Sequence, residues 1–204
     1  MPIATLPRSF YLQPTQVVAR ELLGKVVVRT LESGERLAGT IVETEAYLRD
    51  DPASHSVAGP TARNRSMFGP GGHAYVYFSY GMHNMLNVVT GPAGVGEAVL
   101  IRALEPLEGT ETMLRHRGID DLRQATNGPG KAAQALAITR ADDGADLTLP
   151  GGALRIEEGL PAAFEIVCTT RIGITKGIEH PWRYYIGGCR YVSRTRRTVS
   201  TPVQ

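Results

Sequence analysis

Apolar and polar residues alternate along most of the chain in short stretches that turns rich in glycine and proline separate. Successive side chains of a strand point to opposite faces, so this pattern predicts β-strands. We expect strands at 25–31, 36–48, both arms of 74–89, 97–104, 154–156, 165–170 and 183–186. Helical spacing instead marks 12–24, 110–117 and 131–138.

The residues around the helical stretches support these limits. Thr15 is placed to cap the first helix and Gly24 to end it. Gly118 ends the second helix, and 127–130 lead into the third. Hairpins dominate and strand–helix–strand units are scarce. The pattern therefore predicts one domain of mixed α/β class with a largely antiparallel sheet.

The stretch 41–47 carries an unusual pair of charges. Alternation would place Ile41, Glu43, Glu45 and Tyr47 on one face, and Val42 with its partners on the face that can enter a core. Two carboxylates on one face of a strand are unfavourable for folding. They either point to solvent from an edge strand, or one of them acts as a general base beside the Tyr47 ring.

Three further features carry candidate chemistry. The long polar loop 49–72 contains His55, which could contact a ligand, and loops of this length are often functional. Tyr80 precedes Gly81 at a predicted hairpin tip, where it either packs on a loop or stacks on nucleic acid. The turn 128–131 could bind phosphate or simply cap a helix.

Composition narrows the class of protein. The chain has 204 residues, with 42% apolar and 21% charged residues, as in an ordinary soluble globular protein. Two cysteines, Cys168 and Cys189, are too few for a disulfide framework and are expected to be free thiols. We expect no signal peptide and no membrane span. The protein is therefore expected not to be secreted.

Charge and motifs add a partner class. The net charge is only +2, but seven basic and two acidic residues lie in 160–204, a balance that suits a polyanion or a solvated, frayed basic end from about residue 194. The five histidines show no metal-ligand spacing, and the zinc-deaminase, phosphate-loop and nucleophile-elbow signatures are absent from the sequence. Together the features favour an enzyme that handles a nucleic-acid base.

Several long blocks resemble one family. They are IVETEAYLRDDPASHS, TARNRSMFGPGGHAYVYFSYGMHNMLNVV, VLIRALEPLEG, GPGKAAQALAI and RIGITKG. In this order they are similar to the alkyladenine DNA glycosylases, also called human-type 3-methyladenine or methylpurine DNA glycosylases, from about residue 12 to 193. The resemblance implies a single domain over 1–204 with a curved antiparallel sheet, flanking helices and a protruding β-hairpin.

The resemblance also implies the chemistry. Such enzymes flip a damaged purine out of duplex DNA and hydrolyse its N-glycosidic bond, leaving an abasic site. Glu45 matches the general base that activates water, and Arg102 an arginine beside that water. A carboxylate there would stabilise the positive charge that develops on the deoxyribose. Alkylated purines are cationic and leave readily, whereas neutral lesions such as hypoxanthine need more assistance.

The family's base pocket maps onto four positions. Tyr47, His55 and Tyr77 match the groups that stack on the flipped base and hydrogen-bond to it. Asn87 matches a residue that disfavours the guanine amino group.

DNA contacts are implied at five positions. Tyr80 matches the residue that enters the minor groove and fills the space that the base leaves. Thr61, Met67, Met82 and Lys131 match expected contacts to DNA.

No metal or cofactor is implied. The three lysines lie outside 45–87, so a Schiff-base lyase step is not expected. A monofunctional hydrolase follows, acting as a monomer on double-stranded DNA in the bacterial nucleoid or a eukaryotic nucleus.

Some positions depart from the family pattern. The loop between His55 and Met67 is one residue shorter, and His83 stands where a bulkier aromatic is expected. The lesion range, among 3-methyladenine, 7-methylguanine, hypoxanthine and etheno-adenine, stays open, as does the role of Glu43. Two other hypotheses remain: a non-catalytic binder of damaged DNA or RNA, and a metal-dependent hydrolase with Glu43, Glu45 and His55 as ligands.

Overall fold

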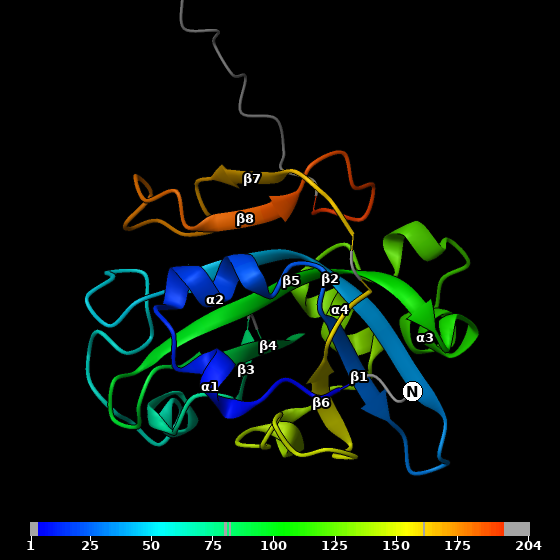
Figure 1. The fold of residues 1–204 in the computed structure, drawn as a ribbon, viewed down its shortest axis with the longest axis horizontal. Helices are drawn as coiled ribbons and strands as arrows, with labels where there is room; N and C mark the ends of the chain where they lie inside the picture. Colours follow the sequence, from blue (N-terminus) through cyan, green and yellow to red (C-terminus); the bar gives the residue numbers. More distant parts are fainter. Residues whose placement is uncertain (1–3, 80, 82, 161, 194–204) are drawn as a thin grey trace, which may run out of the picture.

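A computed structural model describes residues 4–79, 81, 83–160 and 162–193. Their strands form one strongly curved sheet in the order β3-β4-β5-β2-β1-β6, with β8 paired to β2 and β7 paired to β8 (Figure 1). Within the described residues every strand pair is antiparallel, which confirms the predicted mixed α/β fold with a largely antiparallel sheet. The strands are β1 (Val26–Thr30), β2 (Arg36–Tyr47), β3 (Ala74–Ser79), β4 (His83–Thr90), β5 (Glu97–Glu108), β6 (Leu154–Glu157), β7 (Ile166–Thr169) and β8 (Arg183–Ile186).

Strand β2 is the centre of the sheet. One of its edges pairs with β5, while the other pairs with β1 over residues 36–40 and with β8 over 43–45. The register with β5 shifts between Ile41 and Glu43 and again between Glu43 and Thr44. Such bulges interrupt the alternation of side chains. Figure 1 shows the β7–β8 hairpin lying above this part of β2.

The bulges correct one prediction about faces. Ile41 does not share the face of Glu43; it lies in the main core with Ala46. Val42 does not enter that core and packs instead with Ala103 and Tyr191 on the opposite side. An extra residue in β2 opposite β5 lets Val42 and Glu43 point the same way. The shared face of Glu43 and Glu45 was predicted correctly, since Arg102 bonds to both.

The predicted first helix is wrong in its limits. The predicted segment 12–24 contains only the shorter helix α2 (Thr15–Glu21), and a separate short helix, α1 (Arg8–Tyr11), precedes it. Pro14 occupies the N-cap position of α2, and Thr15 is its first helical residue. The Thr15 hydroxyl is not a cap because it bonds to the side chains of Thr90 (2.8 Å) and Glu97.

Other predicted limits agree better with the structure. Helix α3 (Thr110–Arg117) and strand β8 were predicted exactly. Helix α4 (Pro129–Ala135) begins two residues before its predicted start at 131, because proline suits the first helical position. Strand β5 continues four residues beyond the predicted end, to Glu108. The 3-10 turns are η1 (Arg65–Phe68), η2 (Leu122–Gln124) and η3 (Arg140–Asp142).

The main core lies between one face of the sheet and the helices. Buried side chains of α2, α4 and strands β1 to β6 form it, including Val18, Ile41, Ile101 and Leu136. A separate small cluster of Met67, Tyr75, Val89 and Ala98 lies on the other side of the sheet. Tyr47, Phe68 and Tyr77 pack against that cluster while remaining partly exposed, so this is where the sheet offers aromatic surface.

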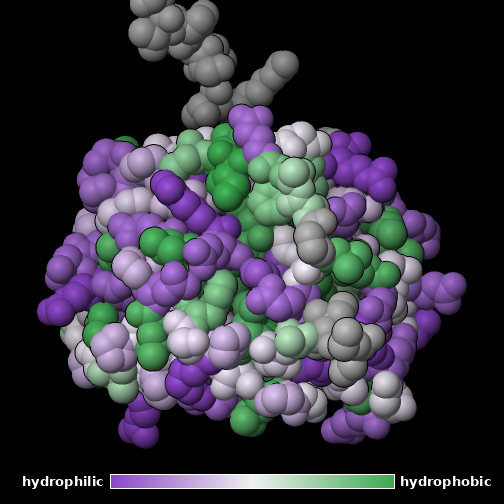
Figure 2. Space-filling view, viewed as in Figure 1, coloured by the Kyte–Doolittle hydropathy of each residue, from purple (hydrophilic) through white to green (hydrophobic). Residues whose placement is uncertain are grey.

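The surface is mixed in character. On the face drawn in Figure 2, apolar and polar residues lie in small interspersed groups. Both cysteines are free thiols, as expected, with Cys168 exposed and Cys189 half-buried. Within the described ranges, the helices are all too short or too polar to cross a membrane.

Candidate active site

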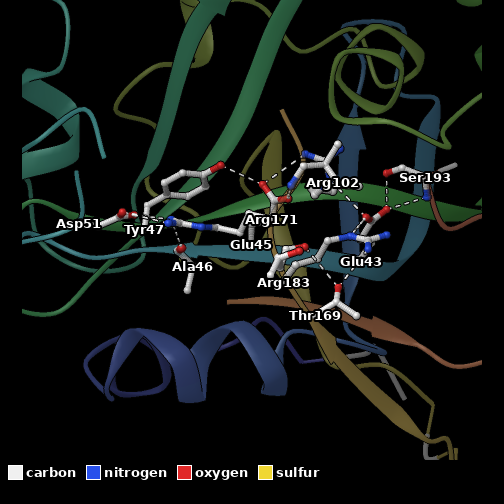
Figure 3. A network of polar contacts seen from close by, with 12 residues as sticks. Glu43, Glu45, Ala46, Tyr47, Asp51, Arg102, Thr169, Arg171, Arg183 and Ser193 are labelled. Atoms are coloured by element: carbon white, nitrogen blue, oxygen red, sulfur yellow. Dashed lines mark hydrogen bonds and ion pairs between the residues drawn. The ribbon is translucent and has the colours of Figure 1, made fainter. Parts of the chain in front are cut away.

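The two carboxylates of β2 do not point to solvent. Glu43 and Glu45 are both 0% exposed, so the edge-strand interpretation is wrong. Strands β5 and β8 flank them and cover the position where an edge would have been. Buried carboxylates need partners to offset the loss of hydration. Figure 3 shows that arginines from both neighbouring strands supply them.

Glu45 is held by three donors. Its Oε2 accepts from the Tyr47 hydroxyl at 2.9 Å and from an Nη of Arg102 at 3.2 Å (Figure 3). Its Oε1 accepts from the backbone N–H of Ile172 at 2.7 Å. Burial raises the pKa of Glu45 above the ordinary glutamate value, although Arg102 and the other donors oppose the shift. A raised pKa is typical of a carboxylate that exchanges a proton during catalysis.

Glu43 has a separate set of partners. Its Oε1 accepts from Nε of Arg102 at 3.2 Å and from Nε of Arg183 at 2.6 Å. Its Oε2 accepts from the backbone N–H of Ser193 at 2.7 Å and from the Ser193 hydroxyl. Arg102 therefore bridges the two glutamates, with only 7% of its surface exposed.

A cavity of about 610 Å³ opens beside this network. Tyr47, His55, Tyr75, Tyr77 and Arg102 are among the residues that line it, so the structure brings together side chains from β2, β3, β5 and the long loop. The His55 and Tyr77 rings lie 4.5 Å apart at 78°, and the Tyr75 and Tyr77 rings 5.5 Å apart. Glu45 lies just behind this lining, bonded to Tyr47 and Arg102.

Hydrogen bonds fix the polar groups of the cavity. Nδ1 of His55 lies 2.9 Å from the Tyr75 hydroxyl. Burial, together with the guanidinium of Arg63, lowers the pKa of His55 below its ordinary value. The Asn87 amide is buried and donates to the carbonyl oxygens of Tyr75 (3.0 Å) and Met85 (3.4 Å). These bonds hold His55, Tyr75 and Asn87 in fixed orientations along the cavity wall.

Sequence reasoning assigned no role to Arg171, which lies in the loop that follows β7. Arg171 donates to both carboxylate oxygens of Asp51 (one bond of 2.9 Å) and to the carbonyl oxygen of Gly177 (3.2 Å). Its guanidinium lies over the rings of Tyr47 (4.7 Å) and Trp182 (5.1 Å). Arg171 thus fixes both the back of the Tyr47 ring and the loop that supplies the Ile172 N–H.

The predicted DNA contacts have varied surroundings. Thr61 is exposed and bonds to Asn64 within its own loop. Met67 is only 2% exposed, so it forms part of the cavity wall and not of the outer surface. Nζ of Lys131 donates to Asn127 Oδ1 at 2.7 Å. Tyr80 and Met82 lie outside the described residues, as does the basic end from 194.

The position of Lys176 corrects the argument about lysines. We expected the three lysines to lie away from the site, but Lys176 lines the mouth of the cavity through the loop after β7. Spacing along the chain could not show this, because the loop folds back over β2.

The structure does not support the metal-dependent hypothesis. Within the described part of the chain, Glu43, Glu45 and His55 do not form a group that could bind a metal ion, and neither do any other three His, Cys, Asp or Glu side chains.

Comparison with known proteins agrees with the resemblance. A family model described as methylpurine-DNA glycosylase (MPG) matches residues 9–190. A protein of Methanoculleus marisnigri named "Putative 3-methyladenine DNA glycosylase" is 52% identical over 194 residues, which cover 93% of this chain and 99% of the relative. A protein of Carboxydothermus hydrogenoformans with the same name is 51% identical over 190 residues, covering 93% and 98%. The chain therefore belongs to the methylpurine-DNA glycosylase family, the DNA glycosylases that hydrolyse N-glycosyl bonds.

Proposed function

We propose that this protein is a monofunctional DNA-3-methyladenine glycosylase that excises alkylated purines, 3-methyladenine and 7-methylguanine first among them. Hypoxanthine and etheno-adenine are the further lesions to test. The observation that carries the proposal is a buried glutamate directly behind an aromatic cavity. The cavity is large enough for a purine, and the carboxylate is held by an arginine, a tyrosine and a backbone N–H.

The flipped base stacks between Tyr47 and the His55–Tyr77 pair. A base that stacks between two rings needs a separation of about 7 Å between those rings, twice the contact distance of roughly 3.5–4 Å. His55 and Tyr77 are already in ring contact at 4.5 Å, so the base cannot enter between them. Tyr47 lines the cavity from β2, a different element, and supplies the second face. Asn87 lies at the wall, where a purine substituent meets a rigid amide.

Glu45 acts as the base on water. A carboxylate has about four acceptor positions, and its three donors leave one position on Oε1 for the water. As the bond to the purine breaks, positive charge grows on the deoxyribose, and the nearby carboxylate stabilises it while it takes a proton from the water. Alkylation at N3 or N7 has already made the purine a cationic leaving group.

The rest of the DNA is engaged at the mouth of the cavity. Tyr80 enters the minor groove and fills the space that the base leaves, which offsets part of the few kcal/mol that unstacking the base costs. Thr61, Lys131 and the exposed Lys176 contact the sugar–phosphate backbone. Lys176 acts there as a cation for phosphate and not as a Schiff-base nucleophile, so the enzyme is a hydrolase without lyase activity. We also propose that it acts as a monomer.

The test is Glu45→Gln, which keeps the shape of the side chain and removes its charge. We expect the single-turnover rate of base release from a 3-methyladenine duplex to fall by about 10²–10⁴-fold, the usual contribution of a general base. DNA affinity should stay near that of the unchanged protein. Because the base must be ionised and burial raises the pKa of Glu45, the rate should decline with falling pH earlier than an ordinary glutamate would require.

The alternatives give different results in the same assay. Intact base release by Glu45→Gln would reject the general base, and no release by the unchanged protein from any of the four lesion duplexes would favour a non-catalytic binder. Activity that disappears in excess chelator would favour a metal-dependent hydrolase. Release accompanied by strand cleavage and a borohydride-trapped covalent complex would instead identify a lyase step at a lysine.

A further inference from the structure

Four charged side chains form a closed group behind the cavity. Glu43, Glu45, Arg102 and Arg183 are 0%, 0%, 7% and 5% exposed. They come from β2, β5 and β8, and their charges balance, with two negative and two positive. Buried charges are tolerated only with such partners. Glu43 is the member that contacts both arginines, yet it does not line the cavity.

The bridge from Glu43 to Glu45 passes through one rigid group. Nε of Arg102 donates to Glu43 and one Nη donates to Glu45, each at 3.2 Å. A guanidinium is planar, so fixing its Nε also fixes the direction of its Nη groups. Without Glu43, Arg102 would keep, among the described residues, its bond to Glu45 alone, and its planar group could rotate about that contact.

From this geometry we infer that Glu43 is a positioning residue: it orients Arg102, and through Arg102 the carboxylate of Glu45, for attack by water. The inference rests on the proposed role of Glu45 as the base. Outer-shell groups that orient the ligands of metal sites typically change activity by about 10–100-fold, and we expect an effect of the same order from Glu43. Glu43 does not line the cavity, and it acts on Glu45 through Arg102 and through its own negative charge.

The carboxyl-terminal segment takes part in the same arrangement. Ser193 donates its backbone N–H and its hydroxyl to Oε2 of Glu43. Just before it, Tyr191 is 4% exposed and packs against Val42 and Ala103, on the side of β2 that carries Glu43. Glu43 is thus held from both ends, by two arginines at Oε1 and by the segment 189–193 at Oε2. The proposal therefore extends to Ser193, which restrains Glu43.

Charge gives the inference a second readout. The groups that face Glu45 are Glu43 and Tyr47 on β2, Arg102 on β5, Arg183 opposite it on β8, and Arg171 in the following loop. The negative charge of Glu43 works with burial to keep the pKa of Glu45 high. Removing that charge leaves two balancing arginines facing one carboxylate, so the pKa of Glu45 should fall.

The experiment uses Glu43→Gln, Glu43→Asp and Ser193→Ala in the full chain. Single-turnover rate constants are measured across pH on a 3-methyladenine duplex, because an exponential rate constant does not depend on how much of the enzyme has folded. Glu157→Gln is the matched control, since Glu157 is also a buried strand glutamate that contacts two arginines, Arg36 (2.6 Å) and Arg155 (2.8 Å), but on β6 and outside the cavity lining.

We expect Glu43→Gln to lower the rate constant by about 10–100-fold with unchanged DNA affinity, and to move its acidic limb to lower pH. Glu43→Asp keeps the charge but shortens the arm by one methylene group, so it should slow the reaction without moving the limb. Ser193→Ala should cause a smaller loss, because the backbone N–H remains. Glu157→Gln should alter neither the rate constant nor the pH profile.

Including Glu45→Gln distinguishes a failure of the positioning role from a failure of the proposed function. If Glu45→Gln abolishes base release while Glu43→Gln matches the unchanged protein in rate constant and pH profile, the positioning role is wrong and the proposed function stands. If Glu45→Gln retains activity, the proposed function itself fails. Equal effects of Glu43→Gln and Glu157→Gln would also overturn the inference, because they would reflect a loss that any buried ion pair produces.

Discussion

The pair of Arg171 and Asp51 should contribute strongly to stability, because neither side chain has any exposed surface. We propose to remove it with Asp51→Ala. The guanidinium would keep the carbonyl oxygens of Ala46 (3.0 Å) and Gly177 (3.2 Å), but would lose the carboxylate to which it bonds within the described residues. A buried positive charge would then remain without a counter-charge.

The size of the effect follows from the bonds that are lost. Two hydrogen bonds join Arg171 to Asp51, and bonds to charged groups contribute about 1.5–3 kcal/mol each. Their sum agrees with the roughly 3–5 kcal/mol that breaking one partner of a buried pair usually costs. Asp51 also accepts from the N–H of Ala53 at 3.0 Å. We expect the free energy of unfolding to fall by about 4 kcal/mol, equivalent to a decrease in Tm of roughly 8–16 °C for a chain of this size.

The assay can follow the site directly. The single tryptophan, Trp182, stacks on His180 at 4.0 Å, and Arg171 lies over its ring. Urea unfolding is followed by two probes. Tryptophan fluorescence reports the loss of structure around the site, and far-UV circular dichroism reports the loss of secondary structure in the whole protein. The matched control is Asp50→Ala, since the neighbouring Asp50 is 91% exposed and contacts only Arg49 at 3.6 Å. Equal midpoints for the two variants would refute the reasoning.

Three further outcomes are expected. An NMR titration of His55 should give a midpoint below the ordinary value of about 6.5, because burial and a nearby guanidinium disfavour its charged form; a midpoint above it would contradict this. Tyr80→Ala should shorten the lifetime of the flipped base, measured by fluorescence of a base analogue, while the fold stays stable; an unfolded variant would indicate a packing role. DNA affinity should fall steeply with salt if Arg194, Arg196 and Arg197 contact phosphates, by about 0.9 in log K per log salt for each phosphate neutralised, and a flat response would reject those contacts.

The sequence was informative where local rules decide the structure. Period-two alternation correctly placed Glu43, Glu45 and Tyr47 on one side of β2, and glycine correctly marked the end of α3. The same alternation failed at Ile41 and Val42. A bulge depends on the register with β5, and no residue type within β2 indicates where it lies.

Long-range contacts explain the remaining misses. Arg171 and Ile172 lie more than 120 residues after β2, and they bond to Ala46 and Glu45 only because the loop after β7 folds over that strand. Nothing in the local pattern of RIGITKG distinguishes a buried arginine from an exposed one, or shows that a backbone N–H points at a carboxylate. Lys176 was misjudged for the same reason, since its distance along the chain says nothing about its place at the cavity mouth.

The two carboxylates that looked unfavourable on one strand become explicable as a balanced group. Without charged partners, burial would favour the protonated form of Glu45. An exposed Glu45 would instead be hydrated and keep an ordinary pKa. Arg102 keeps Glu45 ionisable, but an arginine held by a single carboxylate would lower the basicity of that carboxylate too far. Glu43 holds Arg102, and Arg183 donates to Glu43 and balances the added negative charge, so Glu45 retains a raised pKa and a fixed direction. The negative charge of Glu43 on β2 is therefore the feature that would let Glu45, two residues later, work as a base.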